Sequence, residues 1–438
     1  MRSNPAAFAA LVVVLGCSSD GELPNQSTSS SASSSSGAGA GSASGSSGGE
    51  GGMGNGGAGG MGGGGGAGGA GGMTGAGGTG GMGGAGGTGG SGGMGGGSAS
   101  GTLLVLAGPE GAEAHYQPQA GWSTGSINLQ FSASALASHE GGAIAVARRL
   151  SATPAENDEL FWATWKAGVG FGAVQKVGNF GFAKDGPAVA TAGVAAVMTF
   201  LGTDNKHYFA QHSMGAFSPF GPVPAGMVQD QAFGPSASTL ASDGGAGVYA
   251  VYAGDDGKLY HSFKSGPGGA WEASTGVPTS PVVNYIRPVA SFDPLMKRLH
   301  ILYVRKSDNR LCLVERQFPQ GSWQPEQQID LTALTAMSPS IFVHNGIYHI
   351  AWHGYVDNGI YMVHGKGPGL WGAPQTVDAP PTSTTEPVVL PGLPGADAEI
   401  VYATGGKLKH ARLSVQTITV TEVPGVNDVN NLSATIVP

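Results

Sequence analysis

The amino-acid sequence predicts an all-β protein, a seven-bladed β-propeller that follows a disordered glycine-rich tether. Three sequence markers recur between residues 102 and 438 with a period of about 48 residues, and each marker has seven copies. A repeat of this length that contains several short strands and turn signals is typical of a propeller blade rather than of a helical solenoid. The markers therefore predict seven blades.

The first marker is a proline or another apolar residue, followed by small residues at the start of a strand. Its copies are 45 to 56 residues apart and begin at Phe131, Pro187, Pro235, Pro288, Pro339, Pro387 and Leu432. The second marker is an apolar-aromatic pair that begins another strand. Its copies are His115, Phe161, Tyr208, Tyr260, Cys312, Tyr361 and Lys409.

The third marker is an aromatic residue shortly after a glycine, followed by a short strand. Its copies are Trp122, Phe171, Phe217, Trp271, Trp323, Trp371 and, without the glycine, Val415. Because these residues recur at one structural place in every repeat, packing between blades explains them better than contact with a ligand.

Each unit also has a half-buried strand between the first two markers, such as residues 248–252, which ends in tight-turn residues such as Asp256-Gly257. Residues 103–129 carry the second and third markers but not the first, whereas residues 432–437 carry only the first. Together these two segments complete one blade. We therefore expect the C-terminal strand to pair with the N-terminal blade, which closes the ring and removes open sheet edges.

The beginning of the chain has the pattern of an export signal. Arg2 supplies a positive charge, residues 6–15 form a short apolar run, and a small residue precedes Cys17. The stretch 14–17, Val-Leu-Gly-Cys, resembles the lipobox of bacterial lipoproteins. The resemblance implies a signal peptide at 1–16, lipidation of Cys17, and a protein anchored by lipid in the outer membrane of the cell envelope and displayed at the surface. The alternative is an unmodified thiol in an ordinary signal peptide.

Residues 17–101 have the composition of a flexible linker. Between Pro24 and Thr102 there is no Val, Leu, Ile, Phe, Tyr, Trp, Lys or Arg, so this stretch has almost nothing to bury against the entropy of ordering. Its serine and glycine repeats predict a disordered tether whose end-to-end distance is about 50 Å. One folded domain, residues 102–438, is expected after it.

The composition of the folded domain excludes several classes of partner. It contains 19 basic and 25 acidic residues, a formal net charge of −6, so nucleic acid is not an expected partner. It has no apolar run of the roughly 20 residues that a membrane helix needs, so membrane contact is expected only through the lipid anchor. If Cys17 carries lipid, Cys312 has no partner for an intramolecular disulfide.

Segments 200–205, 254–261 and 303–311 resemble the repeat of the PLL-like seven-bladed propeller lectins, and the resemblance extends from Leu103 to Val437. It implies a carbohydrate-binding protein with pockets for fucose or related sugars between its blades. The sequence departs from the family pattern because Phe171 and Phe217 replace tryptophan and Lys409 weakens the last blade. Only some of the pockets are therefore expected to remain.

Sugar recognition requires an aromatic face for the C–H side of the ring and planar donors and acceptors for the hydroxyls. Trp162 and Trp352 are expected in the blade core, because strand aromatics usually pack between sheets. The candidate ligand-binding residues lie near strand ends and are Arg149, Trp165, Arg305, His353 and Tyr355.

We expect neither a metal site nor a cofactor. His349 and His353 are four residues apart on one strand, about 13 Å, which is too far for both to bind one ion. Segment 265–271 resembles a sialidase Asp-box without its aspartate, and no spaced pair of carboxylates for glycoside hydrolysis is apparent.

The sequence therefore predicts a surface lipoprotein that binds glycans and is not an enzyme. One alternative is a propeller for adhesion that binds an extracellular protein. The other is a sialidase-like glycoside hydrolase, which would need arginines to converge in the folded chain; Arg148, Arg149, Arg287, Arg298, Arg305 and Arg316 are the residues available for this.

Overall fold

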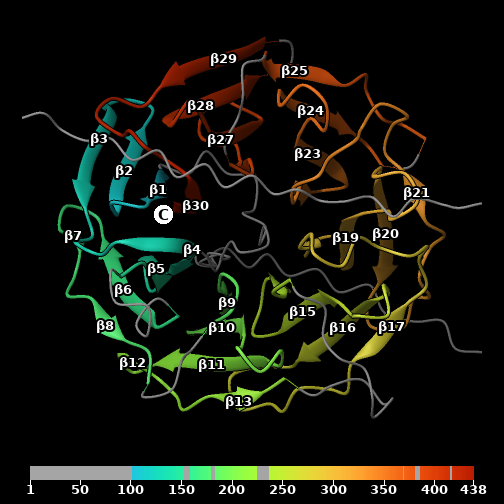
Figure 1. The fold of residues 1–438 in the computed structure, drawn as a ribbon, viewed down its shortest axis with the longest axis horizontal. Helices are drawn as coiled ribbons and strands as arrows, with labels where there is room; N and C mark the ends of the chain where they lie inside the picture. Colours follow the sequence, from blue (N-terminus) through green and yellow to red (C-terminus); the bar gives the residue numbers. More distant parts are fainter. Residues whose placement is uncertain are drawn as a thin grey trace, which may run out of the picture. The chain divides into compact units, whose positions relative to one another are not determined.

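The computed structural model describes residues 101–151, 158–178, 183–223, 236–367, 369–379, 385–414 and 417–438. The described residues belong to one compact unit and form seven antiparallel sheets arranged in a ring (Figure 1). The prediction of a seven-bladed propeller is confirmed. The expected signal peptide, Cys17 and the tether lie outside the described residues, as does the third-marker copy Val415.

The strands are named along the chain, and the blades are numbered from the first one whose strands are consecutive. Blade 1 contains β4 (Phe131–His139), β5 (Gly142–Arg149), β6 (Leu160–Lys166), β7 (Gly170–Phe171) and β8 (Gln175–Lys176). Blade 2 contains β9 (Ala188–Ala192), β10 (Ala195–Leu201), β11 (His207–Ser213), β12 (Ala216–Phe217) and β13 (Gly221–Pro222). Blade 3 contains β14 (Thr239–Ser242), β15 (Val248–Ala253), β16 (Leu259–Lys264) and β17 (Thr275–Val277).

The remaining blades each have four strands. Blade 4 contains β18 (Val289–Asp293), β19 (Arg298–Val304), β20 (Leu311–Gln317) and β21 (Gln327–Gln328). Blade 5 contains β22 (Ser340–His344), β23 (Ile347–His353), β24 (Ile360–Gly365) and β25 (Gln375–Asp378). Blade 6 contains β26 (Val388–Pro391), β27 (Ala398–Thr404), β28 (Lys407–Ser414) and β29 (Thr417–Glu422). Blade 7 contains β30 (Asn431–Val437), β1 (Thr102–Gly108), β2 (Ala112–Gln117) and β3 (Gly121–Ser126).

Blade 7 is closed by the two ends of the domain, as the sequence predicts. The last strand, β30, pairs antiparallel with β1 along its whole length, from Asn431 opposite Gly108 to Val437 opposite Thr102. The first strand of every blade faces the centre of the ring (Figure 1), and each contacts the first strand of the next blade all the way round. Each sheet therefore has its outermost strand at the outside of the ring, while its innermost strand packs beside those of the two neighbouring blades.

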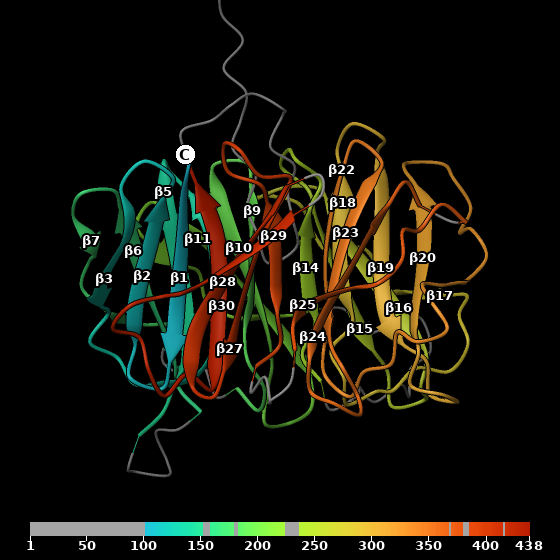
Figure 2. The same ribbon diagram turned by 90° about the horizontal axis from the view of Figure 1, so that it is seen from above.

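The strands run between the two ends of the ring (Figure 2). We call the end where the innermost strands begin the start face; it carries the turns that follow Arg149 and His353. We call the opposite end, where the innermost strands finish, the end face; it carries the turns at Val194 and Asn345. Within the described ranges, the structure has no helix with the length and apolar composition that a membrane span requires.

The predicted second-marker residues occupy equivalent positions on the third strand of six blades. In blade 7, the predicted residue His115 lies three residues after the equivalent position. In blade 2, Tyr208 lies opposite Phe200 at the start-face end of the pair β10–β11. The corresponding pair in blade 7, counted outward from β30, is Ala107 opposite Ala112. Ala112 rather than His115 is therefore the seventh copy, because only three residues separate β1 from β2, whereas five separate β10 from β11. We call this place the reference position of each blade.

The third-marker residues pack between blades, as expected. Trp271 is buried in a cluster that joins strands of blades 2 and 3, and Trp323 packs against the cluster of blades 3 and 4. Trp371 and Trp122 pack in the same way against the clusters of blades 4 and 5 and of blades 6 and 7. The sequence repeat therefore reports the packing of one blade on the next.

A shared contact holds the turn between the second and third strands in three blades. A tyrosine at the reference position donates a hydrogen bond to an aspartate of the turn, in the pairs Tyr208–Asp204, Tyr260–Asp256 and Tyr361–Asp357. The ring lies directly against a glycine, because a Cβ added to Gly254 would come within 2.8 Å of the Tyr260 ring. The tight-turn residues seen in the sequence are thus part of a repeated turn lock.

Several histidines are buried within and between the blades. His207 is fully buried, and burial together with the nearby charge of Arg287 lowers its pKa to about 3. Burial also lowers the pKa of His261 and of His349 to about 4. These rings are neutral at pH 7, so their protonation favours the unfolded chain.

Removal of residues 431–438 is expected to destabilise the whole ring. Loss of β30 exposes the backbone groups of β1 and uncovers Leu104 and Leu106, which are fully buried. We predict a much lower melting temperature and a less cooperative transition by circular dichroism. A control that lacks only Pro438, which is exposed and outside β30, should melt like the full chain. A 431–438 deletion that melts at the same temperature as the full chain would contradict the closure.

The buried histidines make the propeller less stable in mild acid. Their pKa values lie below the ordinary value near 6.5, so the stabilisation is complete above pH 6.5 and is lost as the pH falls toward the folded values. At pH 5 the loss is about 2 kcal/mol for each such histidine. We predict that the free energy of unfolding in urea falls between pH 7 and pH 5, and that His207→Phe falls by a smaller amount. An equal fall in both proteins would refute the role of His207.

Candidate functional site

The five residues predicted to bind a ligand do not form one site. Arg149 belongs to blade 1, Arg305 follows the second strand of blade 4, and His353 and Tyr355 belong to blade 5, all toward the start face. Trp165 lies at the other end of blade 1. Each residue therefore has to be judged in its own surroundings.

Trp165 is part of the core. It is 3 % exposed, and its indole Nε1 donates a hydrogen bond to Oε1 of Glu113 in blade 7 at 2.5 Å. The ring cannot offer a face to a sugar in this arrangement. Trp162 and Trp352, which the sequence assigns to the core, are also buried.

Arg305 replaces the turn lock in blade 4. Cys312 stands where other blades have the tyrosine, and Arg305 stands where they have the glycine beneath its ring. The guanidinium fills this space, donates to Asp308 at 2.6 and 2.9 Å, and forms an ion pair with Glu326 at 3.1 Å. Hydrogen bonding to Asp308 raises the pKa of Arg305 and lowers that of Asp308. Its structural task corrects the sequence-based assignment to ligand binding.

The other three candidates differ in accessibility. Arg149 lies 3.8 Å from a carboxylate oxygen of Glu159, and its guanidinium is 5.5 Å from the ring centre of Phe161. His353 is only 6 % exposed, so its side chain is largely buried. Tyr355 is half exposed and borders a cavity of about 390 Å³ next to Thr332 and Asp357. Tyr355 is therefore the most accessible of the five.

The structure reveals a repeated contact between neighbouring blades that lies toward the end face. The side chain one residue after the reference position of a blade meets the side chain four residues after the reference position of the next blade. We call these two residues a groove pair, since they lie in the groove between two third strands. The observed groove pairs are Trp162–His212, Phe209–Lys264, His261–Arg316, His410–Tyr116 and Glu113–Trp165.

In several grooves the pair makes polar contacts with its neighbours. Between blades 1 and 2, Nε2 of His139 and Nδ1 of His212 are 3.1 Å apart, and both side chains are buried. Between blades 6 and 7, His410 lies 2.7 Å from the fully buried Glu399 carboxylate, which also contacts Arg412. The contacts use only part of these polar groups, because Nδ1 of His139, Nε2 of His212 and Nδ1 of His410 have no hydrogen-bond partner among the described residues.

The groove between blades 3 and 4 is open, with a cavity of about 560 Å³. Its aromatic wall is formed by Tyr249, whose ring centre lies 4.6 Å from that of Phe263 and 4.7 Å from that of Phe318. Its polar lining is formed by side chains of both blades, namely Asp243, His261, Glu272, Lys297 and Arg316. We call this cavity the 3/4 groove.

Protein contacts fix some of the charged groups of the 3/4 groove. Arg316 donates from Nε to the Gly321 carbonyl at 2.8 Å, and its guanidinium lies 4.7 Å from the ring centre of Phe318. Asp243 accepts hydrogen bonds from the backbone of its own turn. In contrast, the side chains of Glu272 and Lys297 have no hydrogen-bond or ion-pair partner among the described residues. The groove thus offers both charges beside an aromatic wall.

Burial and charge set the protonation states in the 3/4 groove. Burial, reinforced by Arg316, lowers the pKa of His261 to about 4, so its ring is neutral at pH 7. Burial and the charges of Asp243 and Glu272 raise the pKa of Tyr249. Near neutral pH, a ligand would meet a neutral imidazole, a phenol, two cations and two carboxylates. This set can donate and accept hydrogen bonds but contains no polarised nucleophile.

The structure also bears on metal binding and on the hydrolase alternative. In the part of the chain that the structure describes, no three His, Cys, Asp or Glu side chains form a group that could hold a metal ion. The arginines considered for a sialidase-like triad have separate partners: Arg148 donates to the Lys184 carbonyl, Arg287 to the Gly186 carbonyl, and Arg298 to Glu315. They do not converge on the 3/4 groove.

The sequence contains a signal for the 3/4 groove, but this signal appears only when residues of two neighbouring repeats are compared. His261 and Arg316 are 55 positions apart, yet each has a fixed offset from the reference position of its own blade. An alignment of the seven repeats that compares each unit with the next would pair these two columns. The residue types in the paired columns, charged or aromatic, would then show which grooves are filled by side chains.

No protein-family model matches the chain, and no curated protein matches it. Among solved structures, the BP39L lectin from Burkholderia pseudomallei is similar with a TM-score of 0.57 and 14 % identity, over 74 % of this chain and 95 % of the lectin. A proposed 6-phosphogluconolactonase from Bacteroides uniformis is similar with a TM-score of 0.50 and 12 % identity, over 77 % of this chain and 100 % of that protein. Likeness at these identities shows the propeller fold.

The second similarity corrects one sequence-based expectation. We expected that the protein is not an enzyme, because no spaced catalytic residues are apparent in the sequence. The same fold occurs in a protein assigned as a lactonase. The expectation that this protein is not an enzyme is therefore wrong, because neither the fold nor the repeat excludes an enzyme. The comparisons therefore show that this chain has a propeller fold found both in a lectin and in a proposed enzyme.

Proposed function

We propose that the propeller binds carbohydrate, and that the 3/4 groove is its principal binding site. One observation carries this proposal: in the 3/4 groove, an aromatic wall lies beside charged side chains that can reach a ligand. Two of these side chains, Glu272 and Lys297, are unpaired among the described residues. The similarity of the fold to the BP39L lectin supports the proposal.

The chemistry of the 3/4 groove suits a sugar ring. The C–H face of a pyranose packs on an aromatic face, for which the partly exposed Phe263 and Phe318 are available, with the buried Tyr249 ring packed against both. Sugar hydroxyls both donate and accept, so the Glu272 carboxylate can accept while the Arg316 guanidinium donates with two parallel N–H groups. A cavity of about 560 Å³ is large enough for a monosaccharide with part of a second ring.

Fucose is the first sugar to test, because the repeat resembles that of PLL-like lectins. A 6-deoxy sugar also presents a methyl group, which can pack against the ring of Phe318. In the filled groove between blades 6 and 7, by contrast, the Glu399 carboxylate is fully buried in contact with His410 and Arg412 and is not available to a ligand. Binding is therefore expected in some grooves and not in all seven.

A glycan array probed with the full chain should show saturable binding, followed by calorimetric titration with each hit and with free fucose. Arg316→Lys keeps the charge but loses the planar fork, and Glu272→Gln loses the carboxylate; each is expected to weaken binding about tenfold. Glu422→Gln, at an exposed carboxylate of blade 6, is the matched control.

The remaining outcomes separate the alternatives. Loss of binding in Tyr355→Ala or Arg149→Lys, with Arg316→Lys unchanged, would place the sugar on the start face and overturn the 3/4 groove. A blank array would favour the reading of an adhesion propeller that binds an extracellular protein.

We also propose that Cys17 is lipidated and that the tether holds the propeller at the outer membrane, exposed at the cell surface. The motif at 14–17 and the composition of residues 17–101 support this placement. Cells that express the full chain should incorporate labelled palmitate into it, whereas Cys17→Ser should not be labelled. A mature protein that begins downstream of Cys17 without lipid would refute the anchor.

A further inference from the structure

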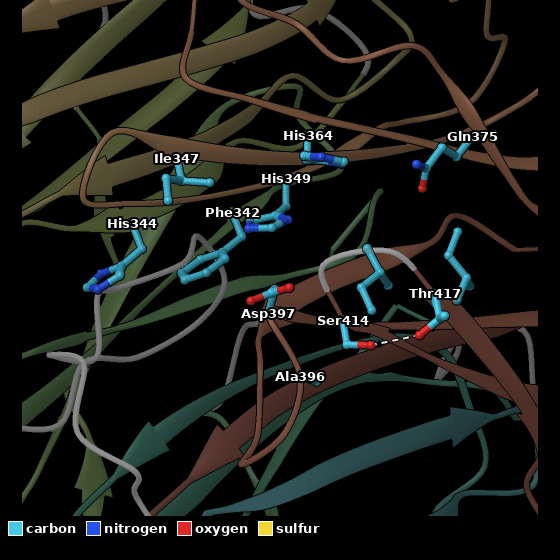
Figure 3. Close-up of a pocket in the computed structure, with 12 residues that line it drawn as sticks. Phe342, His344, Ile347, His349, His364, Gln375, Ala396, Asp397, Ser414 and Thr417 are labelled. Carbon is cyan, nitrogen blue, oxygen red and sulfur yellow. Dashed lines mark hydrogen bonds between the residues drawn. The ribbon is translucent and has the colours of Figure 1, made fainter.

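A second open groove lies between blades 5 and 6, at the same place in the repeat as the 3/4 groove. Its cavity is about 510 Å³, a volume typical of small-molecule sites. One wall is formed by β22, β23, β24 and the start of β25 of blade 5, and the other by the turn before β27, the end of β28 and the start of β29 of blade 6. Figure 3 shows the lining side chains. We call this cavity the 5/6 groove.

Rings form the blade 5 wall of the 5/6 groove. Phe342 lies between His344 and His349, at ring-centre distances of 6.3 and 6.1 Å and interplanar angles of 3° and 18°. His349 in turn lies opposite His364 on the neighbouring strand, with ring centres 6.5 Å apart. Figure 3 shows these four side chains along one side of the cavity. Together they make a continuous aromatic surface.

The wall from blade 6 is apolar and small. Ala396, Leu413 and Ile418 line it, and the groove pair at this interface, Met362 with Leu413, is apolar and buried. The hydroxyls of Ser414 and Thr417 lie 2.7 Å apart and satisfy each other (Figure 3). Besides these two hydroxyls, the polar lining of the groove consists of Gln375, Asp397 and the three histidines.

The histidines of the 5/6 groove leave ring nitrogens without a partner. Nδ1 of His344 and Nδ1 of His349 make no hydrogen bond within the described part of the chain, and both atoms are closed to solvent. His349 is 8 % exposed, so a ligand in the groove reaches its ring through the other nitrogen, Nε2, for which no hydrogen bond is found among the described residues either. Burial and the neighbouring His364 lower the pKa of His349 to about 4, against the opposing effect of Asp397, so the ring is neutral at pH 7.

The charge of the 5/6 groove differs from that of the 3/4 groove. Its lining includes no lysine or arginine among the described residues, and the carboxylate of Asp397 stands at its exposed side. An anionic ligand would be repelled by this carboxylate, whereas the neutral ring of His349 offers a hydrogen-bonding group to a ligand without charge. A neutral ligand with a flat apolar body and one hydrogen-bonding group fits these observations.

We propose that the 5/6 groove binds a neutral phenol, whose ring lies against the wall of Phe342 and His349 and whose hydroxyl bonds Nε2 of His349. This site is separate from the proposed carbohydrate site, so either proposal can fail without the other. The two open grooves would allow one propeller to hold two chemically different groups at its end face.

The probe for this site is 4-fluorophenol, which is neutral at pH 7, observed by fluorine NMR during titration of the full chain. We expect saturable line broadening with a Kd on the order of 1 mM, as suits a ligand of eight heavy atoms. Ala396→Trp fills the cavity and should weaken binding at least tenfold. Val194→Trp is the matched control, because exposed Val194 occupies the same repeat position in blade 2, and it should bind like the parent chain.

A second comparison tests the hydrogen bond. The parent chain should prefer 4-fluorophenol to 4-fluoroanisole, which cannot donate, by about tenfold, and His349→Phe should abolish this preference while it keeps the aromatic wall. Ser414→Trp, at an exposed residue elsewhere on the blade 6 wall, blocks the groove if Ala396→Trp fails to fold. Broadening that does not saturate, that persists in both blocking variants, or that keeps the phenol preference in His349→Phe would overturn the proposal.

Discussion

Backbone hydrogen bonds between β30 and β1 join the two ends of the described chain, with Val437 opposite Thr102 and Asn431 opposite Gly108. This pairing turns six consecutive blades and two end segments into a ring in which every blade packs against two neighbours. A side-chain bond at 2.8 Å between Ser134 of blade 1 and Ser433 of blade 7 adds to the closure. The grooves between blades have fixed walls only because the ring is closed.

The backbone of the blades is repeated around the ring, whereas the side chains of the groove pairs differ in chemistry. These side chains determine what each groove can bind. Trp165 with Glu113, and His410 with Tyr116, fill their grooves with ring and carboxylate contacts. His261 with Arg316 leaves a charged cavity, and Met362 with Leu413 leaves an apolar one. A propeller of this kind can thus change its ligands by substitution at two columns of its repeat, without any change in its strands.

The periodicity of the sequence was sufficient to predict the blades, their number and the closure, because each marker reports a local requirement such as a strand start or a packed aromatic ring. The ligand site was not predictable in this way. Arg305 and Trp165 have residue types that suit sugar binding, yet Arg305 holds a turn and Trp165 bonds the preceding blade. Except for Asp308, their partners lie on other strands, so the order of residues along one strand does not reveal them. For the same reason His349 was compared with His353 on its own strand rather than with His364 opposite it.

The central claim is that function lies in the open grooves between blades. A crystal structure of the full chain with the strongest glycan-array hit tests it most directly. The account predicts that the sugar lies between Arg316 and the aromatic wall of Tyr249, Phe263 and Phe318, and that it displaces none of the contacts around Glu399. Sugar bound at the start face beside Tyr355, or in the central channel beside Arg287, would contradict it.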